Sequence, residues 1–368
     1  MDTIDSLFMS RIDQLEQHLD ELANDPTQPT GNPLFDLVGL EVTGTHNIPS
    51  PYANIIPLIP RLLPKITDIL RRYQLDPLAL CNLAIRLVRP LDFHEAMAYA
   101  PQDALIEALR SPAPSANLLA MTILAKAARS PTDAAVLATM KEVVTSFVTR
   151  WLSAPEVEVG EKATQVLGDL LMIDSTDWPI EGPGESPHEP ASATPNVRGQ
   201  GFMWRRIFFD REVYGLILSL CSKGSHQNAE GGLNTYRLSL AQSRLLRLLP
   251  RIAVYDLAIV TRTTFPDLHR QYMNSDAPGG LLYFAALHMA DTHDFLMSSL
   301  LIDFVQRFFS TQVATPNSAF KMDTLRNIYQ ALIRNDVQFE NVLLTLPDHI
   351  IPEEADELRQ FIHDITTN

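Results

Sequence analysis

A helical period runs through almost the whole chain, and it limits the fold more than any other feature. Apolar residues recur at intervals of three and four along residues 3–23, where Ile12, Leu15, Leu19 and Leu22 form the clearest stripe. This spacing places apolar side chains on one face of an α-helix. Strand-like alternation is scarce, and FDLVGLEV at residues 35–42 is the only stretch that resembles a strand. The chain is therefore expected to be all-α.

The same period predicts a long series of further helices. They cover residues 51–73, 76–89, 91–99, 102–110, 115–129, 132–153, 157–172, 203–221, 235–249, 279–290, 294–310, 318–333 and 353–365. Short proline-bearing breaks, such as SPAPS at 111–115 and SPTD at 130–133, mark several of the helix starts. Proline suits the first turn because its missing N–H has no partner there. Helices joined by such short turns tend to pack antiparallel.

One region contains an internal repeat. The segments ANLLAMTILAKAA at 116–128 and VGEKATQVLGDLL at 159–171 share an apolar pattern, start about 42 residues apart, and flank one longer predicted helix. That distance is typical of HEAT and armadillo repeats. A helix pair cannot bury its apolar face alone, so neighbouring pairs stack into a solenoid. A three- or four-helix bundle is the alternative, but it uses fewer helices than the pattern predicts. We predict an armadillo- or HEAT-like α-solenoid of stacked helix pairs.

The composition changes at residue 174. The stretch from Asp174 to Arg198 carries five prolines and five acidic residues, and no Lys or Arg precedes Arg198. So few apolar residues cannot offset the entropy of ordering the chain. We therefore predict three parts, namely N-terminal helical repeats at 1–173, an acidic, Pro-rich mobile loop at 174–200, and C-terminal helical repeats at 201–368.

Charge and cysteine content narrow the class of protein. Twenty-nine basic and 44 acidic residues give a net charge of −15, which argues against direct binding of nucleic acid. Cys81 and Cys221 lie in apolar segments without a C-x-x-C partner, so we expect buried, reduced thiols rather than a disulfide or a zinc site. No apolar run reaches the roughly 18 residues that a membrane span needs, and the acidic N-terminal segment does not have the pattern of a signal peptide. We expect a cytoplasmic or nuclear protein with no membrane partner.

Two short segments resemble parts of known functional motifs, but each lacks residues that the function needs. Gly199 and Gly201 lack the third glycine, the preceding strand and the Lys-Ser/Thr pair of nucleotide-binding loops. HEAMAY, which starts at His94, resembles the zinc-protease motif H-E-x-x-H, but Ala98 stands where the second histidine is needed. Neither motif predicts a cofactor, a metal or a catalytic residue.

The cluster HMADTHD at residues 288–294 is the best metal-like group. It contains His288, Asp291, His293 and Asp294 at a turn between two predicted helices. Four nearby ligand types do not ensure converging geometry, and Asp291 or Thr292 as a helix N-cap explains the sequence equally well. A metal-dependent hydrolase that uses His288, His293 and Asp294 remains a remote alternative. We expect no catalytic residue, metal or cofactor.

A row of arginines is the most distinctive surface feature. Arg237, Arg244 and Arg247 fall within about 80° of one another on a helix. The adjoining face is apolar and is expected to enter the core through Leu238, Ala241, Leu245, Leu248 and Leu249. Pro250 ends or bends this helix, so Arg251 can fall inside or outside the row.

Other basic residues can extend this row. Arg86 with Arg89, and Lys126 with Arg129, lie on helices that can be second members of repeat pairs. Such helices line the concave face of HEAT-like arrays, so a basic inner groove is one hypothesis. The alternative is a set of solvated arginines paired with neighbouring acids.

The segment that follows the acidic loop is expected to be a helix of its own. Phe202, Trp204, Ile207 and Phe208 would form its buried stripe, while Arg205 and Arg206 lie beside it. The glycines before it let the chain turn into the helix.

Three stretches resemble a known family. These are MWRRIFFDREVY at 203–214, AQSRLLRLLPRIA at 241–253, and SPYANIIPLIPRLLPKITDILRRYQLDPLAL at 50–80. They are similar to the fungal assembly chaperones of the proteasome regulatory-particle base. These armadillo/HEAT-like proteins are also described as DNA mismatch repair proteins and are related to the animal regulatory-particle subunit 5. The resemblance covers roughly residues 50–260, and members of the family usually run longer than this chain.

The resemblance implies a non-catalytic function. Its members hold the C-terminal domain of one base ATPase subunit in their concave face, promote ring assembly, and leave as the core particle docks. The alternative is a helical-repeat adaptor in DNA mismatch repair or another pathway. The family carries no contact motif that transfers to this chain residue by residue. From the residues themselves we predict partner contacts by Arg237, Arg244, Arg247, Arg205 and Arg206, and we expect a monomer when the protein is free.

Overall fold

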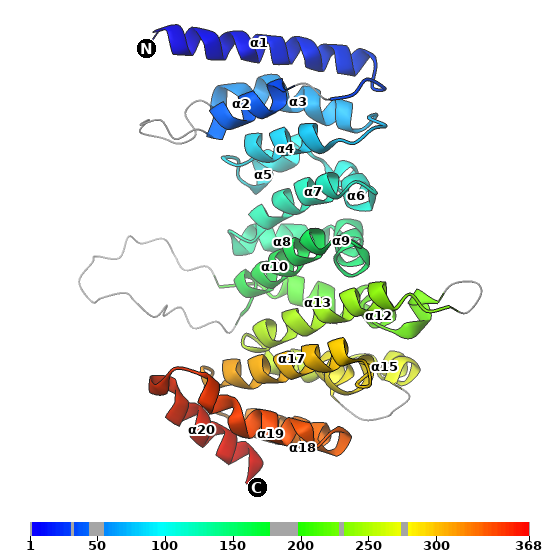
Figure 1. The fold of residues 1–368 in the computed structure, drawn as a ribbon, viewed down its shortest axis with the longest axis vertical. Helices are drawn as coiled ribbons and strands as arrows, with labels where there is room; N and C mark the ends of the chain where they lie inside the picture. The colour runs from blue at the N-terminus through cyan, green and yellow to red at the C-terminus, as the bar shows by residue number, and fades with distance from the viewer. Residues whose placement is uncertain are drawn as a thin grey trace. The chain divides into compact units, whose positions relative to one another are not determined.

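The computed structural model describes residues 2–30, 33–43, 55–176, 198–227, 232–273 and 279–367. Within these ranges the chain forms twenty α-helices and four short 3-10 or π-helical turns, and no strand apart from one isolated bridge between Gln227 and Leu233. The predicted all-α solenoid of stacked helices is confirmed (Figure 1). None of these helices is both long enough and apolar enough to pass through a membrane.

The helices group into two compact units, Met1–Arg150 and Trp151–Asn368. The first unit contains α1 (Asp2–Asn24), α2 (Leu34–Thr43), η1 (Ile56–Leu58), α3 (Ile59–Leu70), α4 (Leu78–Leu87), α5 (Phe93–Tyr99), α6 (Gln102–Arg110), α7 (Pro114–Ala127), α8 (Pro131–Thr139) and most of α9 (Lys141–Ser153). α1 packs on α2 and α3, which pack in turn on α4. α7 contacts α4, α5, α6 and α8, so it forms the centre of this unit.

The second unit begins in the last turn of α9. It contains α10 (Val157–Ile173), α11 (Phe202–Phe208), α12 (Arg211–Leu220), η2 (Lys223–His226), α13 (Thr235–Ala253), α14 (Leu257–Thr261), α15 (Pro266–Met273), α16 (Gly280–Tyr283), η3 (Phe284–Met289), α17 (Phe295–Val313), α18 (Ala319–Asn335), α19 (Gln338–Thr345), η4 (Leu346–His349) and α20 (Pro352–Thr366). α13 is the central helix here because α10 packs on one side of it and α17 on another. In Figure 1, α10, α13 and α17 follow one another in that order.

The predicted apolar stripes form the cores of both units. Ile12, Leu15, Leu19 and Leu22 of α1 are completely buried. On α13 the predicted face is also buried, through Leu238, Ala241, Leu245, Leu248 and Leu249. Cys81 and Cys221 are free and buried, as expected from their apolar surroundings. Burying these side chains supplies most of the free energy that holds such stacks together.

Two predicted helices are each divided in the structure, and the one stretch that resembled a strand is a helix. Residues 35–42, which resembled a strand, belong to the helix α2, with Phe35 and Val38 buried. The single helix predicted over 132–153 is two helices, α8 and α9, which are separated at Met140. The single helix predicted over 203–221 is also two, because Asp210 accepts hydrogen bonds from the backbone N–H groups of Glu212 and Val213 and so starts α12. A side-chain acceptor of this kind is a strong N-terminal signal.

These breaks change the unit of repetition. Along the chain, two shorter helices precede a longer one at α5–α6–α7 and again at α8–α9–α10. The two segments whose similarity revealed the repeat are α7 and α10, the third helix of each group. Pro250 does not end α13, which continues to Ala253.

The predicted mobile loop lies largely outside the described residues, but both of its ends are defined. Asp174 is buried, and its carboxylate accepts hydrogen bonds from the backbone N–H groups of Met203 at 2.6 Å and Gln200 at 3.1 Å. Burial raises the pKa of Asp174 above its ordinary value, while these hydrogen bonds act in the opposite direction. Gly201 has a φ of 70°, a left-handed conformation that favours glycine. The prediction that the glycines let the chain turn is confirmed at this position. The three-part division remains a prediction, and α10, which precedes the loop, contacts α11, which follows it.

Candidate partner-binding site

The predicted arginine row lies against α10 rather than on an open surface. Arg244 is 3% exposed, and its guanidinium donates hydrogen bonds to the carbonyl oxygens of Trp151 at 2.9 Å and Glu156 at 3.0 Å. Trp151 belongs to the last turn of α9, whose final carbonyls have no partner inside the helix. The donors of Arg244 are therefore used inside the second unit, so its burial argues against the predicted contact with a partner protein, which stays a prediction.

Two further arginines of α13 also face α10. Arg247 forms an ion pair with Glu161, and Arg251 forms one with Asp169. Both of these acids belong to α10. Arg237, at the start of α13, is exposed, and no described residue pairs with its guanidinium. Of the predicted row, Arg237 alone has a guanidinium with no ion-pair or hydrogen-bond partner within the part of the chain that the structure describes.

Two glycines of α10 allow this close approach. A Cβ atom at Gly160 would overlap the Arg244 guanidinium, and one at Gly168 would overlap that of Arg251. The glycines are eight residues apart on α10 and the arginines seven apart on α13, so both pairs meet along one side of each helix. The absence of a side chain at these positions is what lets the arginines cross α10.

Basic residues elsewhere also donate hydrogen bonds to carbonyl oxygens near the ends of helices. Lys126 of α7 donates to the carbonyl oxygens of Arg89 and Leu91, just beyond the end of α4. Lys321 of α18 donates to the carbonyl of Gln312, near the end of α17, at 2.6 Å. Burial lowers the pKa of both lysines to about 8. Lys126, which was considered for a basic groove, therefore belongs to the core of the first unit.

This arrangement follows from the electrostatics of helices. The last carbonyls of an α-helix lack intrahelical donors and carry partial negative charge. Arg and Lys provide several N–H donors with a positive charge, and their long stems pack with apolar surface. A repeat array contains many such ends close to the next helix. Neutral donors act in the same way, since the Asn117 amide donates to the carbonyls of Ala108 and Ser111 at the end of α6.

The segment after the loop follows the predicted pattern in part. Trp204, Ile207 and Phe208 are buried, but Phe202 is exposed and Met203 takes its place in the core. The Trp204 indole N–H donates to the carbonyl of Leu171 at 2.8 Å, so it too satisfies a helix end, that of α10. The aromatic stripe is therefore part of the contact between α10 and α11.

The two arginines of this segment differ in their surroundings. Arg206 is half-buried and pairs with Asp210 at 2.6 Å. Arg205 is exposed, stands 5.6 Å from the centre of the Phe202 ring, and lines a cavity of about 230 Å³ together with Trp204. Arg205 and Arg237 are therefore the predicted contact residues of the second unit that are exposed and have no acidic partner among the described residues.

The metal-like cluster is explained by turns. Asp291 accepts a hydrogen bond from the backbone N–H of His293, and Asp294 caps α17 by accepting from the N–H of Met297 at 3.0 Å. The cap is thus Asp294 and not Asp291 or Thr292. Across the described ranges, no three His, Cys, Asp or Glu side chains are arranged to hold a metal ion.

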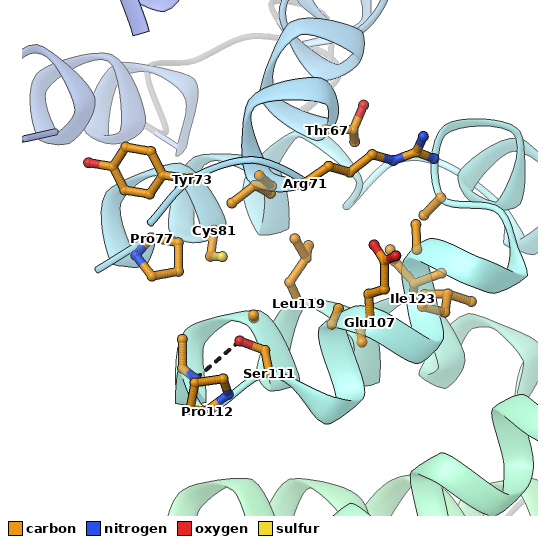
Figure 2. Close-up of a pocket in the computed structure, with 18 of the residues that line it drawn as sticks. Thr67, Arg71, Tyr73, Pro77, Cys81, Glu107, Ser111, Pro112, Leu119 and Ile123 are labelled. Carbon is orange, nitrogen blue, oxygen red and sulfur yellow. Dashed lines mark hydrogen bonds between the residues drawn. The ribbon is translucent and has the colours of Figure 1, made fainter. Parts of the chain in front are cut away.

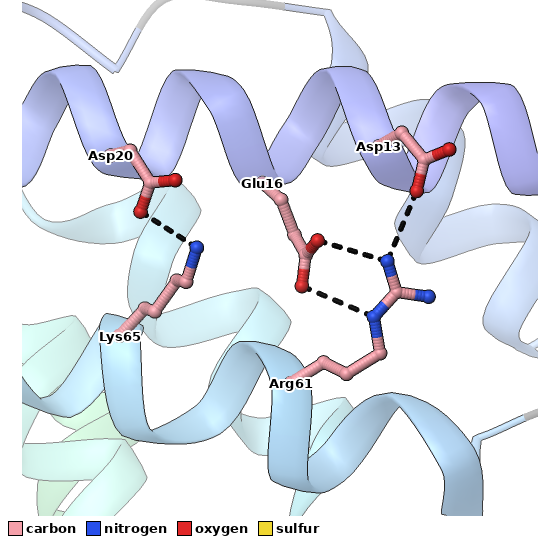
Figure 3. A network of polar contacts seen from close by, with 5 residues as sticks. All are labelled: Asp13, Glu16, Asp20, Arg61 and Lys65. Atoms are coloured by element: carbon pink, nitrogen blue, oxygen red, sulfur yellow. Dashed lines mark hydrogen bonds and ion pairs between the residues drawn. The ribbon is translucent and has the colours of Figure 1, made fainter.

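On the first unit, α1 and α3 are joined by paired charges. Figure 3 shows Arg61 between Glu16 and Asp13, at 2.9 and 3.0 Å, and Lys65 beside Asp20 at 2.7 Å. The cations come from α3 and the acids from α1. These charges therefore pair with one another within the unit and contribute little to the electrostatic potential outside it.

A cleft of about 400 Å³ opens between the end of α3 and the helices α6 and α7. Six alanines contribute small side chains to its walls, namely Ala100, Ala104, Ala108, Ala113, Ala116 and Ala120. Larger apolar residues, among them Leu70, Leu119 and Ile123, complete it, and Cys81 lies at its edge (Figure 2). Burial raises the pKa of Cys81 to about 11, so this thiol stays neutral near pH 7 and is not an activated nucleophile.

Two exposed charges enter the cleft from opposite sides. Arg71 follows the end of α3 and Glu107 belongs to α6; Figure 2 shows both side chains directed into the space between these elements. No described residue forms an ion pair with either side chain. This contrasts with Arg61 and Lys65 of α3, which both have acidic partners. No local sequence pattern indicates this cleft, because its residues come from helices whose relative positions are set only in the folded unit.

Comparison with known proteins does not identify a family. No family model matches the chain, and no curated protein matches it.

Proposed function

We propose that the protein is a non-catalytic scaffold that binds the C-terminal domain of an ATPase subunit and so assists assembly of the proteasome regulatory-particle base. The observation that carries this proposal is the array of stacked helices, a fold that presents extended surfaces to folded partners. The resemblance of residues 50–80, 203–214 and 241–253 to the base assembly chaperones supplies the identity of the partner.

The exposed cations of the second unit support part of this proposal. Arg205 and Arg237 are exposed, and neither has an acidic partner among the described residues. We propose that they face acidic groups of the ATPase domain. Exposed charges of this kind steer association and are screened by salt. Arg206 and Arg247 already pair with acids of this chain, so they would contribute less.

The test is capture of purified C-terminal domains of the base ATPase subunits by the immobilised full chain. The parent is expected to retain one of these domains, with less retained as salt is raised. Replacing both Arg205 and Arg237 by Glu should reduce capture, whereas Arg307→Glu, at an exposed arginine of α17 that pairs with Asp303, should not. If the parent retains none of the ATPase domains, the proposed function is wrong.

A further inference from the structure

The cleft between α3 and α6–α7 is an apolar space that the described residues leave unfilled. Alanines of α6 and α7 face it with side chains too short to reach the opposite wall, and its volume is about 400 Å³. Protein interiors are otherwise closely packed. A cleft of this size, with apolar walls and a few polar groups, has the character of a binding site.

The rim of the cleft extends its apolar surface. Leu75 lines the cleft and is 46% exposed, while Leu78, which follows the lining residue Pro77, is 51% exposed. A small molecule inside the cleft would leave these leucines in water. A protein segment lying across the opening would cover them, as happens when an amphipathic helix enters an apolar groove.

The charges indicate what such a segment carries. Arg71, at the end of α3, and Glu107 of α6 both line the cleft, and neither has an ion-pair partner among the described residues. An occupant that buries apolar side chains in the cleft is complementary if it places an acidic group towards Arg71 and a basic group towards Glu107. Like charges at these positions would be repelled.

We propose that this cleft docks an amphipathic helical segment of a protein partner, with apolar anchors against the alanine walls, an acidic residue facing Arg71 and a basic residue facing Glu107. This inference rests on the proposed function as a protein-binding scaffold, but it does not depend on which ATPase is bound. It places a contact on the first unit, whereas the exposed arginines proposed above belong to the second.

The probe is a labelled, stapled helical peptide of about 15 residues, a length at which an unstapled helix is only marginally stable. It carries two leucines one turn apart, a glutamate one turn before them and a lysine one turn after them. One matched peptide has Gln at both charged positions, and another has Lys at both. Binding to the full chain is measured by fluorescence anisotropy, and hydrogen exchange reports which helices are protected.

The parent chain should prefer the Glu–Lys peptide over the neutral peptide by about fivefold, and the peptide should protect α6 and α7. Arg71→Glu should lower affinity for the Glu–Lys peptide by about tenfold and raise affinity for the Lys–Lys peptide. Ala104→Leu, which fills the cleft from a half-buried position on α6, should weaken binding of all three peptides.

Arg72→Glu is the matched control. Arg72 is exposed, pairs with Asp68 at 2.5 Å and does not line the cleft. Its reversal changes the net charge by the same amount as Arg71→Glu, so it should leave the peptide preference unchanged. Circular dichroism and thermal melting of each variant check that the fold is retained, and Arg71→Gln replaces Arg71→Glu if the reversal disturbs it.

Three results would overturn the proposal: no peptide bound by the parent, no preference among the peptides, or an equal effect of Arg71→Glu and Arg72→Glu. The same variants also separate this proposal from the proposed function. If the parent captures an ATPase domain and Arg71→Glu captures it equally, the cleft is not the contact while the function stands. If no ATPase domain is captured but the peptides follow Arg71, the cleft proposal stands and the partner is a different protein.

Discussion

The contact between α10 and α13 and the cleft between α3 and α6–α7 use basic residues in opposite ways. At the first, Arg244, Arg247 and Arg251 all reach carbonyl or carboxylate oxygens of their own unit. At the second, Arg71 extends from a helix end and contacts no acid in the described chain. Glycines remove side chains at the first site and bring the helices together, whereas alanines at the second leave an open space.

This difference shows how to distinguish basic residues that stabilise a helical array from basic residues that are available to bind a partner. Every helix end presents carbonyls without intrahelical donors, so stacked helices need cations, amides or indoles for their own stability. A basic residue becomes a candidate for partner binding only when such acceptors are out of its reach. By this criterion Arg244 and Lys126 belong to the fold, and Arg71, Arg205 and Arg237 are available.

Trp204→Ala should cause the largest loss of stability among changes to side chains that donate to helix-end carbonyls. Trp204 is buried and donates to the carbonyl of Leu171, so its removal leaves a cavity and an unsatisfied acceptor. We expect the free energy of unfolding to fall by about 3–5 kcal/mol. Urea denaturation followed by circular dichroism measures this loss. Phe202→Ala, at an exposed position of the same helix, is the control and should cost less than about 1 kcal/mol.

Arg244→Met tests whether the buried arginine belongs to the fold. Methionine keeps much of the side-chain volume but leaves the carbonyls of Trp151 and Glu156 without their donor. We expect a loss of about 2–3 kcal/mol in the free energy of unfolding. The matched change is Arg247→Met, at an exposed pair with Glu161, which should cost under about 1 kcal/mol. Equal losses at the two positions would contradict the distinction between a buried arginine that stabilises the fold and an exposed one that does not.

Gly160→Ala tests the close approach itself. The added Cβ would overlap the Arg244 guanidinium, so α10 and α13 must separate or Arg244 must leave its carbonyl partners. Overpacking of this kind costs about 1–3 kcal/mol. Arg244→Ala would remove the obstacle, so the double variant should be less destabilised than the sum of the two single variants. Additive losses would show that the two residues do not meet.

The sequence predicted the elements that depend on local pattern. α6 was predicted over 102–110 and spans those residues, and the predicted stripe of α1 from Ile12 to Leu22 is buried. The break at Met140 was missed because no Pro or Gly marks it. The break before α12 had a signal, Asp210, which acts as an N-cap. The helix α2 was missed because its short apolar run does not distinguish a strand from a buried helix.

The site was less predictable because it depends on which helix covers which face. Spacing placed Arg244 and Arg247 on one side of α13, but it could not show that α10 lies there. A usable signal existed in Gly160 and Gly168, whose spacing nearly matches that of Arg244 and Arg251. The cleft had no local signal, because Arg71 and Glu107 belong to helices that meet only in the folded unit.

The pH dependence of stability should distinguish a buried lysine that donates to carbonyls near a helix end, such as Lys126, from an exposed charged residue. Burial lowers the pKa of Lys126 from 10.5 to about 8. Between these values the unfolded chain holds the proton and the folded chain does not, so stability rises with pH in this window and the gain is lost as pH falls through about 8. Linkage gives a gain of about 1 kcal/mol from pH 7 to 9. The measured quantity is the difference in unfolding free energy between the parent and Lys126→Met. Taking this difference cancels the contributions of the other titrating groups.

Arg71→Gln should have the smallest effect on stability. Its side chain is exposed and lacks an ion-pair partner in the described chain, so only a weak interaction with the end of α3 is lost. We expect a change within about 0.5 kcal/mol in urea denaturation. A loss above 2 kcal/mol would mean that Arg71 satisfies a helix end like Arg244, and the contrast between the two regions would fail. If stability is unchanged and peptide binding is weaker, Arg71 is assigned to partner binding, because its charge then contributes nothing to the stability of the folded chain.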